Sequence, residues 1–258
     1  MSRVPTGIPG LDDMLTDGFI SGDIVLVTGG PGSGKTTLGL QYLHHGAAKY
    51  GEPGIFVTLD ESPARVIRNA WQFGWDIERL VKENTIRVIH ADPVAYAHYI
   101  PTQDSDSDMH LEVGARIVET LSKHIEHRVS DIGAKRIFID SITSLKISQD
   151  RFQARFSIME LIKNLENLDC TTMLSSEITS GALAYESFSV EEYLAEVVIR
   201  MHVVRVAGGR IRAIEILKMR GGKHDDMLRP YAINDTGMVI YPRETIIDSD
   251  AINAVAMM

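Results

Sequence analysis

Residues 28–37 of this chain read Thr28-Gly29-Gly30-Pro31-Gly32-Ser33-Gly34-Lys35-Thr36-Thr37. The segment matches the pattern G-x-x-x-x-G-K-[ST], which is typical of loops that bind nucleotide phosphates. Its glycines allow backbone N–H groups to turn inward around the phosphates, where a Cβ atom would obstruct them. In this pattern Lys35 reaches the β- and γ-phosphates, and the Thr36 hydroxyl binds Mg²⁺. We expect the nucleotide to contact Gly30, Pro31, Gly32, Ser33, Gly34, Lys35, Thr36 and Thr37.

The residues on either side of this loop support the interpretation. Asp23 to Val27 is an apolar run of strand length, and Thr37 to Leu43 carries apolar residues at helical spacing. A strand, a glycine loop and a helix N-terminus in this order form an anion-binding site, because the helix dipole points at the phosphates. A glycine-rich turn without a ligand is the alternative, and it leaves the flanking strand and helix unexplained.

Composition limits the class of protein. Lys and Arg number 26 and Asp and Glu 35, so the net charge is −9, which disfavours general binding of polyanions. Cys170 is the one cysteine, which excludes an intrachain disulfide and is typical of a reducing cytoplasm. No apolar run approaches the roughly 18 residues of a membrane span, and the N-terminus lacks an export pattern. We therefore expect a cytoplasmic protein that does not enter a membrane.

Strand-like and helix-like segments alternate along the chain in the manner of a parallel sheet covered by helices. Beyond Val197 the pattern changes to two strongly alternating strands separated by Gly208-Gly209, which is typical of a hairpin. We predict an α/β fold with a mainly parallel sheet, flanking helices and a C-terminal antiparallel extension, forming one domain over residues 1–244 with a tail at 245–258. The predicted strands are 23–27, 55–59, 86–89, 136–140, 171–175, 197–206, 210–219, 231–233 and 238–241, and the later helices are 63–73, 111–127 and 152–167.

Asp140 ends the apolar strand that begins at Arg136. Open α/β sheets bind ligands at the edge where their parallel strands end. After a phosphate loop, a carboxylate at that edge is expected to hold Mg²⁺ through water, as the aspartate that accompanies such loops does. On the strand pattern alone, Asp140 and Ser141 also read as helix caps.

Asp60 and Glu61 directly follow the predicted strand 55–59, so their carboxylates should lie at the same edge of the sheet. A carboxylate there can orient the water that attacks the γ-phosphate, or accept its proton. The run Asp60-Glu61-Ser62-Pro63 also reads as the acidic start of a helix. We favour catalysis for this pair because a phosphate loop precedes it.

Four further segments carry a family resemblance. They are Val4 to Asp12, then Asp60-Glu61-Ser62-Pro63 with Phe73-Gly74-Trp75-Asp76, then Ile139 to Ser144, and finally Lys218-Met219-Arg220-Gly221-Gly222-Lys223-His224. Together they resemble the KaiC branch of the RecA-like P-loop ATPases, which includes single-domain KaiC-like proteins of archaea. The similarity covers about residues 4 to 242, and Lys-x-Arg-Gly followed by His is its most branch-specific part.

The resemblance implies a RecA-like core in a homo-oligomeric ring, usually a hexamer, with ATP or ADP and Mg²⁺ held between subunits. In KaiC-like rings the Lys-x-Arg motif reaches the phosphates bound by the adjacent subunit, and by position this role falls to Lys218 and Arg220. The resemblance also implies that His224 lies near the nucleotide and that Asp235 contacts the base or sugar. A cation supplied in trans offsets charge on the transferring phosphoryl group and accelerates transfer by about 10³ to 10⁵. Without the resemblance, Lys218 and Arg220 would read as solvated charges beyond a strand end.

One departure from the family concerns the acidic pair. The KaiC branch carries two adjacent glutamates where this chain has Asp60-Glu61. Asp60 is one methylene shorter, so either it positions water less well or Glu61 is the working carboxylate. The sequence leaves this assignment open.

The leading hypothesis is a Mg²⁺-dependent ATPase whose ring couples the state of bound ATP to an unknown protein partner, in a regulatory or signalling role. A second hypothesis is a DNA-acting recombinase or helicase motor. The acidic net charge argues against it, whereas Arg151 and Arg155 lie where such motors carry pore loops. A third hypothesis is a nucleotide-gated scaffold that binds ATP and hydrolyses it very slowly.

Overall fold

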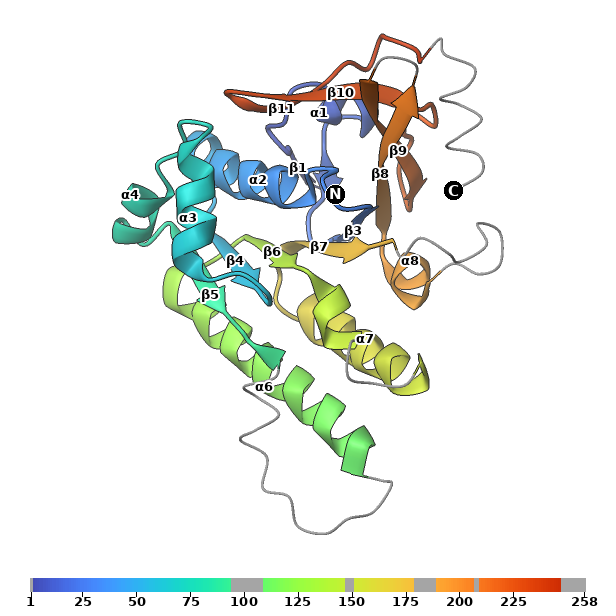
Figure 1. Ribbon diagram of the computed structural model, residues 1–258. Coiled ribbons are helices and arrows are strands. Elements are labelled where there is room, and N and C mark those ends of the chain that lie inside the picture. The colour runs from blue at the N-terminus through green and yellow to red at the C-terminus, as the bar shows by residue number, and fades with distance from the viewer. Residues whose placement is uncertain (1, 94–108, 147–150, 179–188, 207–208, 247–258) are drawn as a thin grey trace.

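The central feature of the computed structural model is a nine-stranded sheet with the strand order β11-β10-β9-β8-β3-β7-β6-β4-β5 (Figure 1). From β8 to β5 in this order neighbouring strands are parallel, and from β8 to β11 they are antiparallel. The structure describes residues 2–93, 109–146, 151–178, 189–206 and 209–246, so most of the predicted tail lies outside it. The bounds are β3 Ile24–Gly29, β4 Gly54–Thr58, β5 Ile86–His90, β6 Arg136–Asp140, β7 Thr171–Glu177, β8 Val197–Val206, β9 Gly209–Met219, β10 Arg229–Asn234 and β11 Gly237–Ile240.

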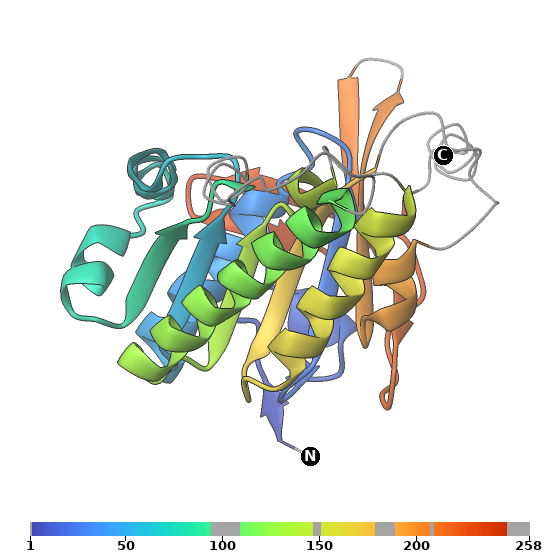
Figure 2. The same cartoon turned by 90° about the horizontal axis from the view of Figure 1, so that it is seen from below.

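Helices cover both faces of this sheet (Figure 2). One face packs against α1 Leu11–Met14, α2 Lys35–Tyr50, α3 Pro63–Trp71 and α4 Ile77–Lys82. The other packs against α6 Met109–Ile132, α7 Arg151–Glu166 and α8 Val190–Leu194. In the described part of the chain, no helix is long and apolar enough to cross a membrane.

The two cores follow from side-chain alternation along buried strands. In β3, Val25 and Val27 belong to the core under α2, whereas Ile24 and Leu26 belong to the core under α6 and α7. Both sets are buried, so β3 reads as a continuous apolar run, as central parallel strands do. The loop that follows β3 is thereby anchored on two packed faces.

The predicted α/β architecture and its antiparallel extension are confirmed. Each predicted strand has a counterpart in the sheet, and the hairpin pairs β8 with β9 along their length. The prediction missed α1, α4, α8 and a small two-stranded sheet, β1 Arg3–Val4 with β2 Phe19–Ile20. All of these elements are short, so none of them shows a clear period in the sequence.

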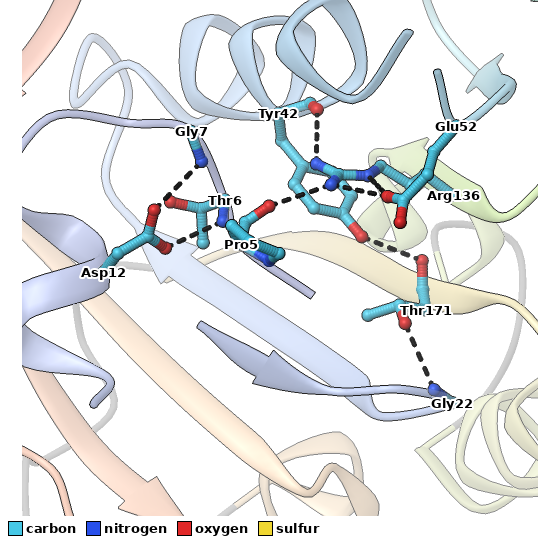
Figure 3. Close-up of polar contacts among 9 residues, drawn as sticks. All are labelled: Pro5, Thr6, Gly7, Asp12, Gly22, Tyr42, Glu52, Arg136 and Thr171. Carbon is cyan, nitrogen blue, oxygen red and sulfur yellow. Dashed lines mark hydrogen bonds and ion pairs between the residues drawn. The ribbon is translucent and has the colours of Figure 1, made fainter. Parts of the chain in front are cut away.

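Arg136, at the start of β6, ties the N-terminal segment to the sheet (Figure 3). Its side chain is fully buried and donates to Glu52 Oε2 at 2.6 Å, to the Tyr42 carbonyl at 3.1 Å and to the Pro5 carbonyl at 2.9 Å. The guanidinium also lies 4.6 Å from the centre of the Tyr42 ring, which is within range of a cation–π contact. This network lies at the edge where the parallel strands begin, away from the phosphate loop.

Candidate nucleotide-binding site

The phosphate loop joins the end of β3 to the start of α2. Gly32 and Gly34 have φ angles of 76° and 94°, a left-handed region that favours glycine. At Gly34 a Cβ atom would also come within 2.5 Å of Ile233 Cδ1, so two constraints require glycine there. Gly34 caps α2 without a side-chain hydrogen bond, which leaves N–H groups of the first helical turn available to an anion.

Lys35 is held inside this loop. Its ammonium donates to the Gly29 carbonyl at 2.8 Å and to the Gly30 carbonyl at 3.3 Å, and the residue is 8% exposed. Burial lowers the pKa of Lys35 below its ordinary value, and the carboxylates of Glu177 and Asp140 oppose that shift. A buried ammonium next to backbone donors is a strong local attraction for phosphate oxygens.

Two further features of the loop fit a bound phosphate. Ser33 Oγ is buried and has no hydrogen-bond partner in the described part of the chain, so its hydroxyl can donate a hydrogen bond to a phosphate oxygen. The Ser33 carbonyl accepts a hydrogen bond of 2.5 Å from the Tyr231 hydroxyl. Tyr231 belongs to β10, so the antiparallel extension holds the loop in position.

Thr36 and Asp140, the two residues expected to hold Mg²⁺, are in direct contact. Thr36 Oγ1 donates to Asp140 Oδ2 at 2.6 Å, and Ser175 Oγ on β7 donates to Asp140 Oδ1. Nowhere in the described residues do three His, Cys, Asp or Glu side chains form a metal-binding group. One hydroxyl and one carboxylate suit Mg²⁺, which takes few protein ligands and completes its shell with phosphate oxygens and water.

The acidic pair lies at the same edge of the sheet. Strand register places Thr58, which precedes the pair, beside Asp140. Ser144 Oγ, in the 3₁₀ helix Ile142–Lys146 (η1) that follows β6, donates to Asp60 Oδ1 at 2.5 Å. Thr58 Oγ1 donates to the Glu61 carbonyl at 2.8 Å and accepts from its N–H at 2.9 Å. The Asp60 carboxylate is therefore held against η1, and the Glu61 backbone is held against the end of β4, at the edge of the sheet where Asp140 lies.

Arg220 lies far from this loop within the chain, and Lys218, two residues before it, lies level with Leu26 in the middle of β3. The backbone N–H of Arg220 donates to the Glu196 carbonyl, and that of Glu196 donates to the Ile24 carbonyl, each at 2.9 Å. Arg220 is thus level with the start of β3, whereas the phosphate loop begins at the other end of that strand. A strand of six residues spans about 17 Å. The chain does not bring these cations to its own phosphate loop.

His224 and Asp235 are also separated from one another. The residue before His224 accepts a hydrogen bond from Thr16 Oγ1 at 2.8 Å, which places His224 beside α1. Asp235 lies in the turn between β10 and β11, where Gly237 packs so closely on Trp75 that a Cβ would come within 2.5 Å of its ring. Ile233, two residues before Asp235, touches Gly34. Asp235 therefore lies on the side of the phosphate loop, and His224 lies beside the end of α1.

Sequence reasoning missed the residues that hold the phosphate loop, Asp60 and Asp140 in place by hydrogen bonds. Ser144 lies in the family segment Ile139 to Ser144 and Tyr231 begins a predicted strand, but neither pattern indicates which group the hydroxyl contacts. Ser175 is the last residue of the predicted strand 171–175, but its contact with Asp140 depends on β7 lying between β3 and β6, which the sequence does not reveal.

Comparison with known proteins shows the same architecture elsewhere. A family model described as the KaiC ATPase matches residues 4–245. A KaiC-like protein of Pyrococcus horikoshii, whose crystal structure is known, shares 33% sequence identity with a TM-score of 0.78, covering 93% of this chain and 99% of that one.

Two relatives differ in length. A UPF0273 protein of Aeropyrum pernix is 33% identical over 252 residues, which cover 95% of this chain and 96% of that protein. The circadian clock oscillator protein KaiC of Prochlorococcus marinus is 34% identical over 242 residues, and the match covers 93% of this chain but 45% of that protein. The chain thus spans about half the length of the clock relative. With its phosphate loop, its Thr36–Asp140 pair and the family model that matches residues 4–245, the chain belongs to the KaiC family of ATPases.

Proposed function

We propose that this protein is a Mg²⁺-dependent ATPase that works as a homo-oligomeric ring, a hexamer, with ATP held between neighbouring subunits. The ring would act in the cytoplasm and couple its ATP or ADP state to a protein partner in a regulatory role. Residues 1–244 would form one ATPase domain, with 245–258 as a tail.

One observation supports the proposed ring. Arg220 lies level with the start of β3, Lys218 lies level with Leu26 in the same strand, and the phosphate loop follows the end of β3, so these cations and the loop of one chain do not meet. A head-to-tail contact between copies would bring the cations of one subunit to the loop of the next, and repeated rotation closes such contacts into a ring. The resemblance of Lys-x-Arg-Gly and His to KaiC rings supports the same arrangement.

Within each composite site the residues divide the work. The loop N–H groups and Lys35 would bind the phosphates, Asp235 would contact the base or sugar, and Thr36 with Asp140 would hold Mg²⁺, which when bound neutralises charge on the phosphates. Asp60 or Glu61 would orient the attacking water and take its proton.

The neighbour would supply the rest of the site. Its Lys218 and Arg220 would offset charge on the transferring phosphoryl group, and its His224 would lie close to the nucleotide.

Mixing two inactive variants tests the proposal. Arg220→Ala keeps its own phosphate loop and Lys35→Ala keeps its own cations, so each should turn over little ATP alone. In randomly mixed rings about one interface in four pairs an intact loop with an intact cation, and up to that fraction of wild-type turnover should return. If each variant forms rings and mixing restores nothing, Lys218 and Arg220 do not complete a neighbour's site.

A DNA motor remains the second candidate because Arg155 is exposed on α7. The side chain of Arg151 lies outside the described residues. Turnover measured with and without single-stranded DNA, with a salt titration of any binding, separates this candidate from the first. Slow hydrolysis in a single-turnover experiment would favour a nucleotide-gated scaffold.

A further inference from the structure

The short helix α8 holds both cations of the proposed trans site. The Lys218 ammonium donates to the carbonyls of Glu192, Tyr193 and Ala195 at 3.0, 2.8 and 2.5 Å. Three acceptors match the three N–H donors of an ammonium group. These carbonyls belong to the C-terminal end of the helix, where cations are favoured by the helix dipole.

Arg220 is attached to the same helix end. Its guanidinium donates to the carbonyls of Tyr193 at 2.7 Å and Leu194 at 3.4 Å, and it lies 3.5 Å from a Glu196 carboxylate oxygen. Both cations are therefore held against the C-terminal end of α8.

Glu191 fixes the other end of α8 to the sheet. Its side chain is 5% exposed and forms an ion pair with Lys146, the last residue of η1. Ser176 on β7 also donates to Glu191 Oε1, at 3.5 Å. Glu192, its neighbour, pairs with Arg200 on β8 at 2.8 Å.

These anchors lie close to the chain's own phosphate edge. Ser176 is paired in register with Thr28, which leads into the phosphate loop, and Ser175 bonds Asp140. Lys146 ends the 3₁₀ helix that begins two residues after Asp140. Contacts thus run from Asp140, through Ser175–Ser176 and through η1, to Glu191, and from α8 to Lys218 and Arg220.

We infer that Glu191, paired with Lys146, is a positioning residue for Lys218 and Arg220: through α8, it holds the cations that a subunit presents to its neighbour. This inference rests on the proposed ring. The Glu191 carboxylate contacts Lys146 and Ser176, so its effect on turnover would act through the placement of the two cations. A displacement of such cations by about 1 Å lowers turnover by as much as about 10²-fold.

The test determines whether a Glu191 variant lowers ATP turnover at its own phosphate loop or at that of the neighbouring subunit. Glu191→Gln keeps the size of the side chain and removes its charge, so turnover should fall by about tenfold or more while ATP affinity of its own loop is kept. Mixed with Lys35→Ala subunits, Glu191→Gln should regain activity, because the Lys35→Ala neighbour supplies well-placed cations. A control is Glu119→Gln, which removes an exposed carboxylate paired with Lys123 and should keep wild-type turnover.

The reference is the mixture of Arg220→Ala with Lys35→Ala. If that reference recovers and the Glu191→Gln mixture does not, Glu191 acts in its own subunit and the inference is wrong, while the ring stands. If neither mixture recovers, the trans site itself is wrong and the inference falls with it.

A second variant guards against loss of folding, which circular dichroism detects. Lys146→Met with Glu191→Leu replaces the ion pair by apolar side chains, a change that proteins often tolerate without loss of stability. This double variant is then mixed with Lys35→Ala subunits in the same way. The inference is wrong if this mixture does not recover while the Arg220→Ala reference does, and it falls with the trans site if neither mixture recovers.

Discussion

Lys35 holds a charge among backbone carbonyls at the mouth of the phosphate loop. Burial disfavours its charged form and lowers its pKa, and the nearby carboxylates of Glu177 and Asp140 raise it. A phosphate oxygen in the loop would add a stronger opposite charge and favour the ammonium further. The residue is therefore suited to bind an anion rather than to pack.

Lys35→Ala removes this charge. We expect turnover to fall by about 10²-fold or more, with loss of ATP affinity, while the thermal transition of the protein changes little. Lys49→Ala is the matched control, because Lys49 is exposed at the far end of the same helix. Titration with a fluorescent ATP analogue measures affinity, and unchanged affinity and turnover in Lys35→Ala would remove the basis of the proposed site.

Asp60 and Glu61 differ in their surroundings. Asp60 accepts a short hydrogen bond from Ser144, which an asparagine oxygen would also accept. Asp60→Asn with Glu61→Gln therefore removes charge while it keeps this link, and we expect ATP binding to persist as hydrolysis falls by about 10² to 10⁴. The two single variants, assayed for phosphate release, identify the working carboxylate. Wild-type turnover in the double variant would show that Asp60 and Glu61 serve only as the acidic residues before α3.

Part of the site could be predicted residue by residue. Lys35, Thr36 and Asp140 follow from motif spacing and from the rule that parallel strands end at one edge. The contact of Ser175 with Asp140 could not, because it depends on strand order. The distance of Arg220 from its own phosphate loop could not be predicted either, because it depends on the register of β3 with β8.

At the scale of elements, long strands and helices were predictable because each buries one or two faces with a clear period. Predicted strand 136–140 and β6 coincide, and predicted helix 152–167 differs from α7 by one residue at each end. The helix α8 was missed because five residues do not establish a period. Its stability comes instead from a capping box at Ser189 and from ion pairs of Glu191 and Glu192 with other elements.

The Arg136 network belongs to this scale, because it joins the N-terminal segment, α2 and β6 (Figure 3). Glu52→Ala leaves the fully buried guanidinium without its carboxylate. We expect a loss of about 2 kcal/mol in unfolding free energy, less than for a fully buried pair because the Glu52 side chain is 29% exposed.

Denaturant titration measures this loss, and ATP affinity should be unchanged. Glu78→Ala is the control, because its pair with Lys82 is exposed, and exposed ion pairs contribute little to stability. Equal effects of the two variants would show that the buried network adds nothing to stability.

At the scale of the whole molecule, Arg220 and the phosphate loop lie at opposite ends of the same central strand. In the proposed ring, a single subunit would therefore bind ATP through its own loop but would lack the cations that offset charge in the transition state. The sequence could not establish this, because strand register and the packing of α8 are tertiary properties. Assembly should therefore control turnover much more strongly than it controls binding.

Dilution tests this consequence. Turnover per subunit should rise with protein concentration and level off where light scattering shows that the ring is complete, because each new contact completes one site. ATP affinity should change far less over the same range. Arg220→Ala should turn over slowly at every concentration, since its rings lack the trans cation. A protein that stays monomeric with ATP and hydrolyses it at a constant specific rate would contradict the trans site, and then Lys218 and Arg220 would serve only to hold α8.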